Sequence, residues 1–330
     1  MVSMKIIKKI LIVVIVPILL LASCTTTNED QDSVLVGIAY RKDTDSEFCT
    51  NVERAMEACG AKCIVLDQVV SYDLEYDSNG TLISGVDKYR ALEPSTAALV
   101  RQNGWKNSNA EEVLEDIDLV IFTGGEDIST SLYLIPQVKD EPDEEIDFNA
   151  ERDVSDFVLM CYCLDHDIPF LGLCRGMQML AVVSGCSMIQ DVPTFFERQG
   201  INYDYLHRNQ KATPDSYRDY NAHPITIMEE SLVYSAYGTS VLEGCPSWHH
   251  QAVRSIEGTN LIVSATTETC GITMVEAIER TDKKFALGLQ FHPEAAYVKH
   301  MDKAQNMNDF MDTDTALKIF QYAVQYAKEN

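Results

Sequence analysis

The first half of the chain alternates short apolar runs with stretches of helical periodicity. Continuous apolar runs bounded by turn residues are typical of strands that are buried on both faces. Stretches with apolar positions three and four apart are typical of helices that pack on a sheet. The predicted order is strand 34–39, helix 51–59, strand 61–66, strand 119–122, helix 151–164, strand 168–173 and helix 176–183. This strand–helix–strand order predicts a parallel sheet.

The second half is richer in short strands, which are predicted at 224–228, 252–255, 261–266, 274–279 and 285–291, before a closing amphipathic helix at 315–326. The segment 67–116 is less regular, because it holds two turn signals and a weak helical stretch near 95–102, and it fits a hairpin or a lid. The whole pattern predicts one α/β domain over residues 34–330. We expect a doubly wound, mostly parallel sheet with helices on both faces.

The N-terminal segment has a different pattern. Lysines precede an unbroken apolar run at 10–22, which is shorter than the roughly 20 residues of a membrane-spanning helix and fits a signal peptide. The run leads into LASC, which resembles a bacterial lipobox with Cys24 as the lipidated residue. An ordinary signal peptide that ends near a cysteine is the alternative. We therefore predict a lipoprotein signal peptide over 1–23 and an acidic, flexible tether over 24–33. The expected location is the cell envelope, facing the periplasm or the cell exterior, with membrane contact through the lipid anchor only.

The composition excludes some kinds of partner. The formal net charge of −25 argues against a nucleic-acid partner, because phosphates require a basic surface. The chain has ten cysteines, but it has no Cys-x-x-Cys pair with metal spacing. We therefore predict no metal site and no cofactor, assign no disulfide, and expect most cysteines to be small buried side chains.

Three predicted strands end in residues that can carry chemistry. One strand leads into a Gly-x-Cys-x-Gly turn centred on Cys174, and another leads into the pair Gly124 and Gly125. The strand near the C-terminus leads into His292 and Glu294. Because the carboxyl ends of parallel strands meet at one edge of a sheet, we expect these residues to lie together.

The residue types at these strand ends suggest a cysteine hydrolase. A cysteine between a strand and a helix has the form of a nucleophile elbow, and the N–H groups of the helix favour its thiolate. We expect His292 to exchange protons with Cys174, and Glu294 to orient the imidazole, which it can do if the chain there is extended. The backbone N–H groups of Gly125 and Arg175 would form an oxyanion hole. Each feature also has a simpler interpretation as a packing turn, a surface ion pair or a plain glycine turn.

Taken together, these residues resemble the class I glutamine amidotransferase-like superfamily. Within it, the chain resembles the γ-glutamyl hydrolases of peptidase family C26, including γ-glutamyl-γ-aminobutyrate hydrolase-like proteins, in the form of a bacterial lipoprotein. The matching stretches are GGED at 124–127, ERD at 151–153, PFLGLCRGMQML at 169–180, IQDV at 189–192, SWHHQAV at 247–253, VEAIE at 275–279 and ALGLQFHPE at 286–294. The resemblance implies a Cys–His–Glu triad that forms an acyl-enzyme and releases glutamate.

The resemblance also implies a pocket for the glutamyl group. The implied substrate-binding residues are Gly124, Gln178, Ser247, Trp248 and His249. The neighbouring pair His249–His250 is interpreted as a feature of this pocket or of packing, not as a metal site. Pro246 stands where the family often has asparagine, and Cys270 where it often has aspartate, which leaves the choice of substrate open.

The predicted function is hydrolysis of the γ-glutamyl amide bond of a small γ-glutamyl compound. One alternative is a glutaminase module that serves a partner synthase, which the signal peptide disfavours. The other is a non-catalytic binding lipoprotein, which the intact triad disfavours. The oligomeric state stays open, with a homodimer as one arrangement.

Overall fold

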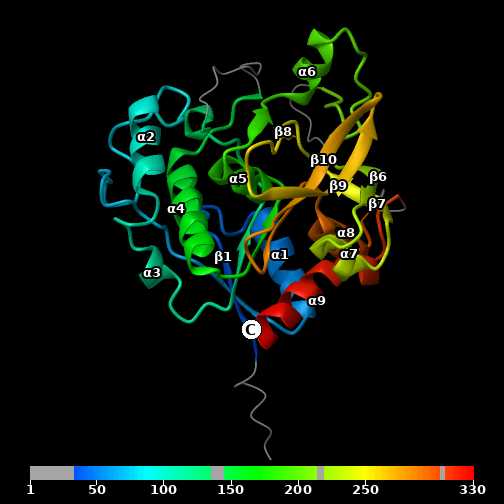
Figure 1. Cartoon of the computed structure of the whole chain (residues 1–330), viewed down its shortest axis with the longest axis horizontal. Coiled ribbons are helices and arrows are strands. Elements are labelled where there is room, and N and C mark those ends of the chain that lie inside the picture. The colour runs from blue at the N-terminus through cyan, green and yellow to red at the C-terminus, as the bar shows by residue number, and fades with distance from the viewer. Residues whose placement is uncertain (1–32, 135–144, 214–218, 305–308) are drawn as a thin grey trace, which may run out of the picture. The chain divides into compact units, whose positions relative to one another are not determined.

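The computed structural model describes residues 33–134, 145–213, 219–304 and 309–330. Its central sheet contains nine strands, β1 (Leu35–Ile38), β2 (Lys62–Val65), β3 (Leu119–Phe122), β4 (Phe170–Leu173), β6 (Asn221–Ile227), β7 (Val241–Ser247), β9 (Leu261–Thr269), β10 (Ile272–Arg280) and β11 (Ala286–Leu289). Their order across the sheet is β2-β1-β3-β4-β11-β10-β9-β6-β7. Figure 1 shows β10, β9, β6 and β7 at the right of the molecule. A separate two-stranded sheet pairs β5 (Ser187–Ile189) with β8 (Ala252–Ser255).

The nine-stranded sheet has a parallel part and an antiparallel part. The strands β2, β1, β3, β4 and β11 are parallel to one another, whereas β10, β9, β6 and β7 continue the sheet in antiparallel pairs. Every residue of β3, β4 and β11 is buried, which explains their continuous apolar sequences. The strand β6 instead alternates buried and exposed positions over its second half, as a strand with one solvent-facing side does. The predicted α/β fold is confirmed, as a mixed and largely parallel sheet.

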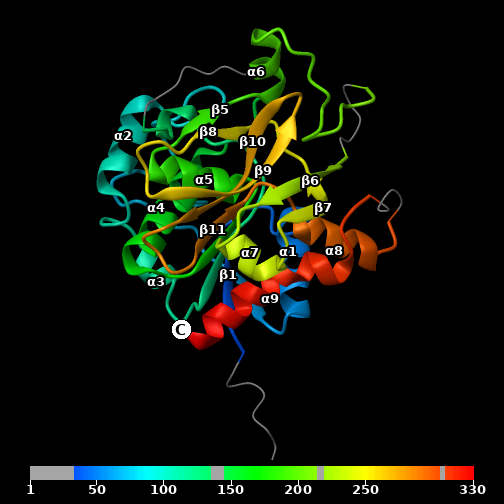
Figure 2. The same cartoon turned by 45° about the vertical axis from the view of Figure 1, so that its right-hand side comes forward.

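Helices cover both faces of the sheet, as predicted (Figure 2). One face packs against α2 (Pro94–Asn103), α3 (Ala110–Val113), α4 (Ala150–His166) and α5 (Arg175–Ser184). The other face packs against α1 (Glu47–Ala58), α7 (Leu232–Tyr237), α8 (Pro293–Met301) and α9 (Thr313–Glu329). The short helix α6 (Val192–Arg198) packs with β5, β8 and β10 in a third apolar cluster, and the 3-10 helix η1 (Thr130–Leu132) follows β3. The sheet is therefore buried on both faces at β3, β4 and β11, whereas the edge strand β2 is largely exposed.

Several elements differ from the sequence prediction. The segment 67–116 holds three isolated bridges, Ser71 with Ser108, Tyr76 with Leu82 and Val86 with Leu92, and the predicted helix α2. Leu82 and Leu92 are buried in the core, so this segment is a packed part of the domain. The elements β5, α6, α7 and β7 were not predicted, and the glycine and proline of β7 explain why its strand pattern is weak.

The predicted signal peptide over 1–23, the lipidation residue Cys24 and most of the tether lie outside the described residues. Among the helices of the described ranges, none is both long enough and apolar enough to cross a membrane. The nine cysteines in the described part of the chain are all free thiols.

Candidate active site

Cys174 lies in a tight turn between β4 and α5, where its backbone adopts φ 50° and ψ −101°. This left-handed φ is strained for a residue with a side chain. The flanking glycines allow the turn, because a Cβ on Gly172 would come within 2.5 Å of the Gly176 backbone. A Cβ on Gly176 would come within 2.4 Å of the Phe122 carbonyl oxygen at the end of β3. The strands β4 and β3 and the helix α5 therefore pack so closely that only glycine fits at these two positions. A strained residue in such a tight turn between a strand and a helix has the geometry of a nucleophile elbow.

His292 and Glu294 lie at the start of α8. His292 is the N-cap of this helix and Pro293 is its first residue, so Glu294 lies in the first helical turn. The expectation of an extended chain between them is wrong, because Pro293 favours the first position of a helix. The two side chains still meet, with 2.6 Å between His292 Nδ1 and Glu294 Oε1. The carboxylate thus holds one nitrogen of the ring and leaves Nε2 for another partner.

The imidazole of His292 is completely buried beside aromatic rings. The Tyr220 ring meets it edge-on at 5.3 Å, and the Phe48 ring lies at 6.3 Å, both between centroids. Burial opposes the charged ring, but the charges of Glu294 and Cys174 outweigh burial and raise the pKa of His292 to about 10. The arrangement therefore favours an imidazolium beside the cysteine at neutral pH.

The glycine turn after β3 is held by two arginines. The Gly124 carbonyl oxygen accepts hydrogen bonds from Arg41 Nη1 at 2.7 Å and from Arg152 Nη2 at 2.9 Å. Because the peptide group is planar and trans, the N–H of Gly125 points away from these guanidinium groups. Gly125 has φ 139°, which favours glycine, and it lines the same cavity as Cys174. The arginines thus orient the peptide that we expect to donate to an oxyanion.

The side chain of Arg175 takes part in a buried ion cluster. It pairs with Asp153, with 2.6 Å between Nη2 and Oδ1, and with Asp156. Arg152 extends the cluster, with Nη1 at 2.5 Å from Glu126 Oε2. The side chain of Arg175 is thereby occupied, and its backbone N–H lies in the first turn of α5, where helix N–H groups lack intrahelical partners.

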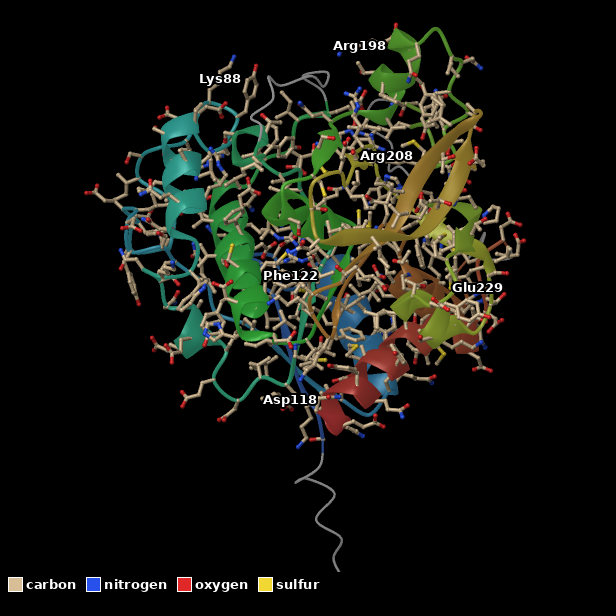
Figure 3. All side chains as sticks on the ribbon, in the orientation of Figure 1. Lys88, Asp118, Phe122, Arg198, Arg208 and Glu229 are labelled. Atoms are coloured by element: carbon tan, nitrogen blue, oxygen red, sulfur yellow. The ribbon has the colours of Figure 1, made fainter. Side chains whose placement is uncertain are left out.

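The cavity beside the cysteine has a volume of about 440 Å³. Five of the predicted site residues line it, namely Gly125, Cys174, Gln178, Trp248 and His249. Behind its wall, Gly124, Arg175 and Ser247 are each adjacent in the chain to a lining residue. The His292 ring lies 6.3 Å from the ring of the lining residue Phe48, between centroids, and Glu294 lies against His292. The cavity lining also includes Arg208, labelled in Figure 3, whose Nη2 lies 2.8 Å from Glu145 Oε2. The predicted residues therefore form one site at the carboxyl edge of the parallel strands.

The predicted substrate-binding residues are fixed by internal contacts. Gln178 Nε2 lies 3.3 Å from the Gln251 carbonyl oxygen and 3.4 Å from Gln290 Oε1. The Trp248 ring stacks on the Phe48 ring, with 5.6 Å between centroids. These contacts place an amide and an aromatic wall around the entrance to the cysteine.

His250 has a role in the loop that the sequence did not reveal. Its ring nitrogens lie 3.1 Å from carboxylate oxygens of Asp127 and Asp191. Burial lowers the pKa of His250, but the charge and hydrogen bond of Asp127, together with Asp191, raise it to about 9. The protonated ring bridges two carboxylates and fixes the loop that carries His249.

Sequence reasoning missed two groups of residues around this site. The first is the set of charged side chains behind the glycine turn, comprising Arg41, Glu126, Arg152, Asp153 and Asp156. The stretches GGED and ERD contain Glu126, Arg152 and Asp153, but the sequence assigned these side chains no role. In the second group, His249, which was predicted only as a substrate-binding residue, lies together with His207, His223 and Glu276 in a buried cluster of potential metal ligands.

The chain is similar in sequence to a known protein family and to several of its members. The family model named peptidase C26 matches residues 94–294, well over half of the chain. Protein NtpR of Enterococcus hirae is 30% identical over 189 residues, which cover 57% of this chain and 71% of that protein. The γ-glutamyl-γ-aminobutyrate hydrolase PuuD of Escherichia coli K12 is 24% identical, covering 56% of this chain and 66% of that protein. Among solved structures, a glutamine amidotransferase from Thermotoga maritima is 16% identical with a TM-score of 0.46, covering 91% of this chain and 99% of that one.

Proposed function

The chain belongs to the peptidase C26 family of glutamine amidotransferase-like hydrolases, and we propose that it cleaves γ-glutamyl amide bonds and releases glutamate. The observation that carries this proposal is the buried His292–Glu294 pair, which faces the strained Cys174 at the wall of the cavity. Two relatives, at 25% and 24% identity, are γ-glutamyl-γ-aminobutyrate hydrolases, which supports a γ-glutamyl substrate for this chain.

In the first step, the Cys174 thiolate attacks the γ-carbonyl carbon of the substrate. A carbon–sulfur bond forms, and the carbonyl oxygen takes the electron pair of its π bond. The N–H groups of Gly125 and Arg175 stabilise this oxyanion. As the carbonyl reforms, the carbon–nitrogen bond breaks, and the imidazolium of His292 gives its proton to the departing amine. The product of this step is a γ-glutamyl thioester on Cys174.

In the second step, a water molecule hydrolyses the thioester. The neutral His292 removes a proton from the water as its oxygen attacks the thioester carbonyl. The carbon–sulfur bond then breaks, glutamate leaves, and the thiolate–imidazolium pair is restored. Glu294 stays ionised throughout and keeps the ring in the orientation that serves both steps.

The cavity wall supports a polar substrate. Gln178, Trp248 and His249 all line the cavity. A glutamyl head group carries an ammonium and a carboxylate, both of which need polar partners when they leave water. We propose that Gln178 and the backbone beside Trp248 and His249 hold the head group, so that the γ-carbonyl reaches Cys174.

Hydrolysis of a panel of γ-glutamyl compounds tests the proposal. The panel contains glutamine and γ-glutamyl amides with neutral, anionic and cationic leaving amines, and glutamate release is measured by a coupled assay. We expect catalytic turnover of at least one γ-glutamyl amide by the wild type and no turnover by Cys174→Ala. The matched control is Cys186→Ala, which removes another buried thiol outside the site and should retain activity. Equal glutamate release by wild type and Cys174→Ala would refute the proposal, and turnover of glutamine alone would favour a glutaminase.

We also propose that the protein is exported and anchored in the cell envelope by a lipid on Cys24. This proposal rests on the LASC stretch and the apolar run before it. In cells expressing the chain, we expect the mature protein in the detergent phase, with an N-terminal lipid-modified Cys24 by mass spectrometry. A soluble mature protein with an unmodified Cys24 would overturn it.

A further inference from the structure

Three histidines and a glutamate meet beneath the loop that lines the cavity. His207 follows α6, His223 lies on β6, His249 follows β7, and Glu276 lies on β10. One ligand atom from each residue can be chosen so that all four lie within 4.8 Å of one another. The nitrogens His207 Nδ1, His223 Nε2 and His249 Nε2 lie 3.3, 3.8 and 4.0 Å from Glu276 Oε1. All four residues are at most 4% exposed.

The inward-facing atoms of this group have no hydrogen bonds among the described residues. They are His207 Nδ1, His223 Nε2, His249 Nε2 and both carboxylate oxygens of Glu276. Buried polar atoms without partners are costly, and five of them around one point are rare in a folded protein. A shared proton or a trapped water would satisfy some of these atoms, whereas a cation at the centre would satisfy four of them together.

The hydrogen bonds of the ring nitrogens that point away from the group determine the tautomer of each histidine. His249 Nδ1 lies 2.8 Å from the Gln251 carbonyl oxygen, and His223 Nδ1 lies 3.2 Å from the Pro224 carbonyl oxygen. A carbonyl oxygen can only accept, so both Nδ1 atoms carry the hydrogen. In the neutral rings, the two Nε2 atoms therefore aim lone pairs at the centre of the group.

The remaining ring is supported in the same way. His207 Nε2 lies 2.8 Å from Thr269 Oγ1, which leaves Nδ1 facing Glu276. Metal-binding histidines usually have their second nitrogen bonded to a carbonyl, a carboxylate or water, which fixes the ring for coordination.

We propose that His207, His223, His249 and Glu276 form a structural site for a divalent transition-metal ion, with Zn²⁺ as the first candidate. Zinc binds histidine nitrogen and carboxylate oxygen at about 2.0–2.2 Å in a tetrahedron, which places ligand atoms about 3.3 Å apart. The distance from His207 Nδ1 to Glu276 Oε1 is 3.3 Å, whereas those from His223 Nε2 and His249 Nε2 are longer, at 3.8 and 4.0 Å, so these two rings would move inward on binding. Since the protein supplies four ligands and the group is buried, the site is closed, as in structural zinc sites.

The site connects the metal to the cavity through one residue. His249 belongs to the metal group and also lines the cavity, between Trp248 and His250. The His207 carbonyl oxygen accepts from the His249 backbone N–H at 3.1 Å and from Ser247 Oγ at 2.9 Å. A metal ion would therefore fix the loop that borders the substrate, and its removal should raise KM more than it lowers kcat.

Metal binding to the purified full chain tests this proposal. The chain is stripped with a chelator and incubated with Zn²⁺ or Co²⁺. After extensive dialysis, bound metal is measured by elemental mass spectrometry and Co²⁺ by its visible spectrum. We expect one ion per chain, a spectrum of a four-coordinate nitrogen and oxygen site without thiolate bands, and a higher Tm with metal. Glu276→Gln and His223→Gln should lose the bound ion.

Two kinds of control separate this site from others. His166→Gln changes an exposed histidine on α4, and Cys174→Ala removes the proposed nucleophile, and both variants should still bind one ion. Since Cys174→Ala should be inactive and still bind the ion, a failure of the proposed function can be distinguished from a failure of the metal site. No retained ion in the wild type, or equal retention in Glu276→Gln, would overturn the proposal. Should the variants fail to fold, the wild-type stoichiometry and the cobalt spectrum still decide the question.

Discussion

Replacing Glu294 by glutamine tests whether the carboxylate makes His292 an acid at neutral pH. Glutamine keeps the length of the side chain and an oxygen that can accept from Nδ1, but it removes the negative charge. The present distance between Nδ1 and Oε1 is 2.6 Å, and both side chains are buried, so water screens the charge weakly. The substitution therefore removes the negative charge beside His292 and leaves the shape of the side chain nearly unchanged.

The size of the effect follows from the pKa of His292. Glu294 and Cys174 raise it from the ordinary 6.5 to about 10, against the opposing effect of burial. This difference corresponds to roughly 5 kcal/mol in favour of the imidazolium, shared between the two neighbours. Without the carboxylate, burial is opposed by Cys174 alone, and the pKa of His292 should fall by several units. Loss of a positioned general acid typically lowers kcat/KM by about 10²–10⁴-fold.

The pH profile of kcat/KM is the assay. The leaving amine needs the proton of His292, so activity is present while the ring is protonated and is lost as pH rises through its pKa. In the wild type, the alkaline loss of activity should therefore lie near pH 10. In Glu294→Gln, it should move to lower pH, and a histidine NMR titration should show the same change. The matched control Glu257→Gln changes an exposed glutamate in a turn and should keep the wild-type profile.

The reasoning would be refuted if Glu294→Gln kept its alkaline loss of activity near pH 10. It would also be refuted by a kcat/KM within about threefold of the wild type at pH 8, because a positioned general acid contributes far more.

Other residues allow three further predictions. Arg41→Met removes one of the two arginine donors to the Gly124 carbonyl, so kcat should fall by about 10–100-fold with a smaller change in KM, measured by steady-state kinetics. Gln178→Ala should raise KM by about fivefold, since one polar contact to the substrate contributes about 1 kcal/mol, and an unchanged KM would exclude a contact between Gln178 and the substrate. Gly176→Ala should lower the free energy of unfolding in urea by more than about 2 kcal/mol because its Cβ would meet backbone at 2.4 Å. The control Gly258→Ala, with open space around its Cβ but φ 80°, should cost about 1 kcal/mol, and equal losses in the two variants would contradict the packing argument.

The strands β3, β4 and β11 could be predicted because they are buried on both faces. The sequences LVIF, FLGL and ALGL are apolar at every position and are followed by residues that a core does not require. The triad residues could be found for a related reason. The glycines around Cys174 and the two-residue spacing of His292 and Glu294 are local patterns that can be recognised in the sequence without knowledge of the fold.

The groups that the sequence did not reveal are assembled by tertiary structure. Arg41 follows β1 and Arg152 lies on α4, yet both reach the same carbonyl oxygen. His207, His223 and Glu276 come from different strands and loops, and no short spacing joins them. Buried charged residues look like surface residues in a sequence, because their burial depends on partners far away in the chain.

The most direct test of the account is whether the γ-glutamyl group becomes attached to Cys174. The wild type is mixed with an excess of a γ-glutamyl anilide, quenched with acid during turnover, digested and examined by mass spectrometry. We predict that the peptide containing Cys174 gains the mass of one glutamyl acyl group, and that the gain disappears once the substrate is exhausted. Glutamate release without any adduct on Cys174, or an adduct on another residue that Cys174→Ala retains, would contradict the central claim.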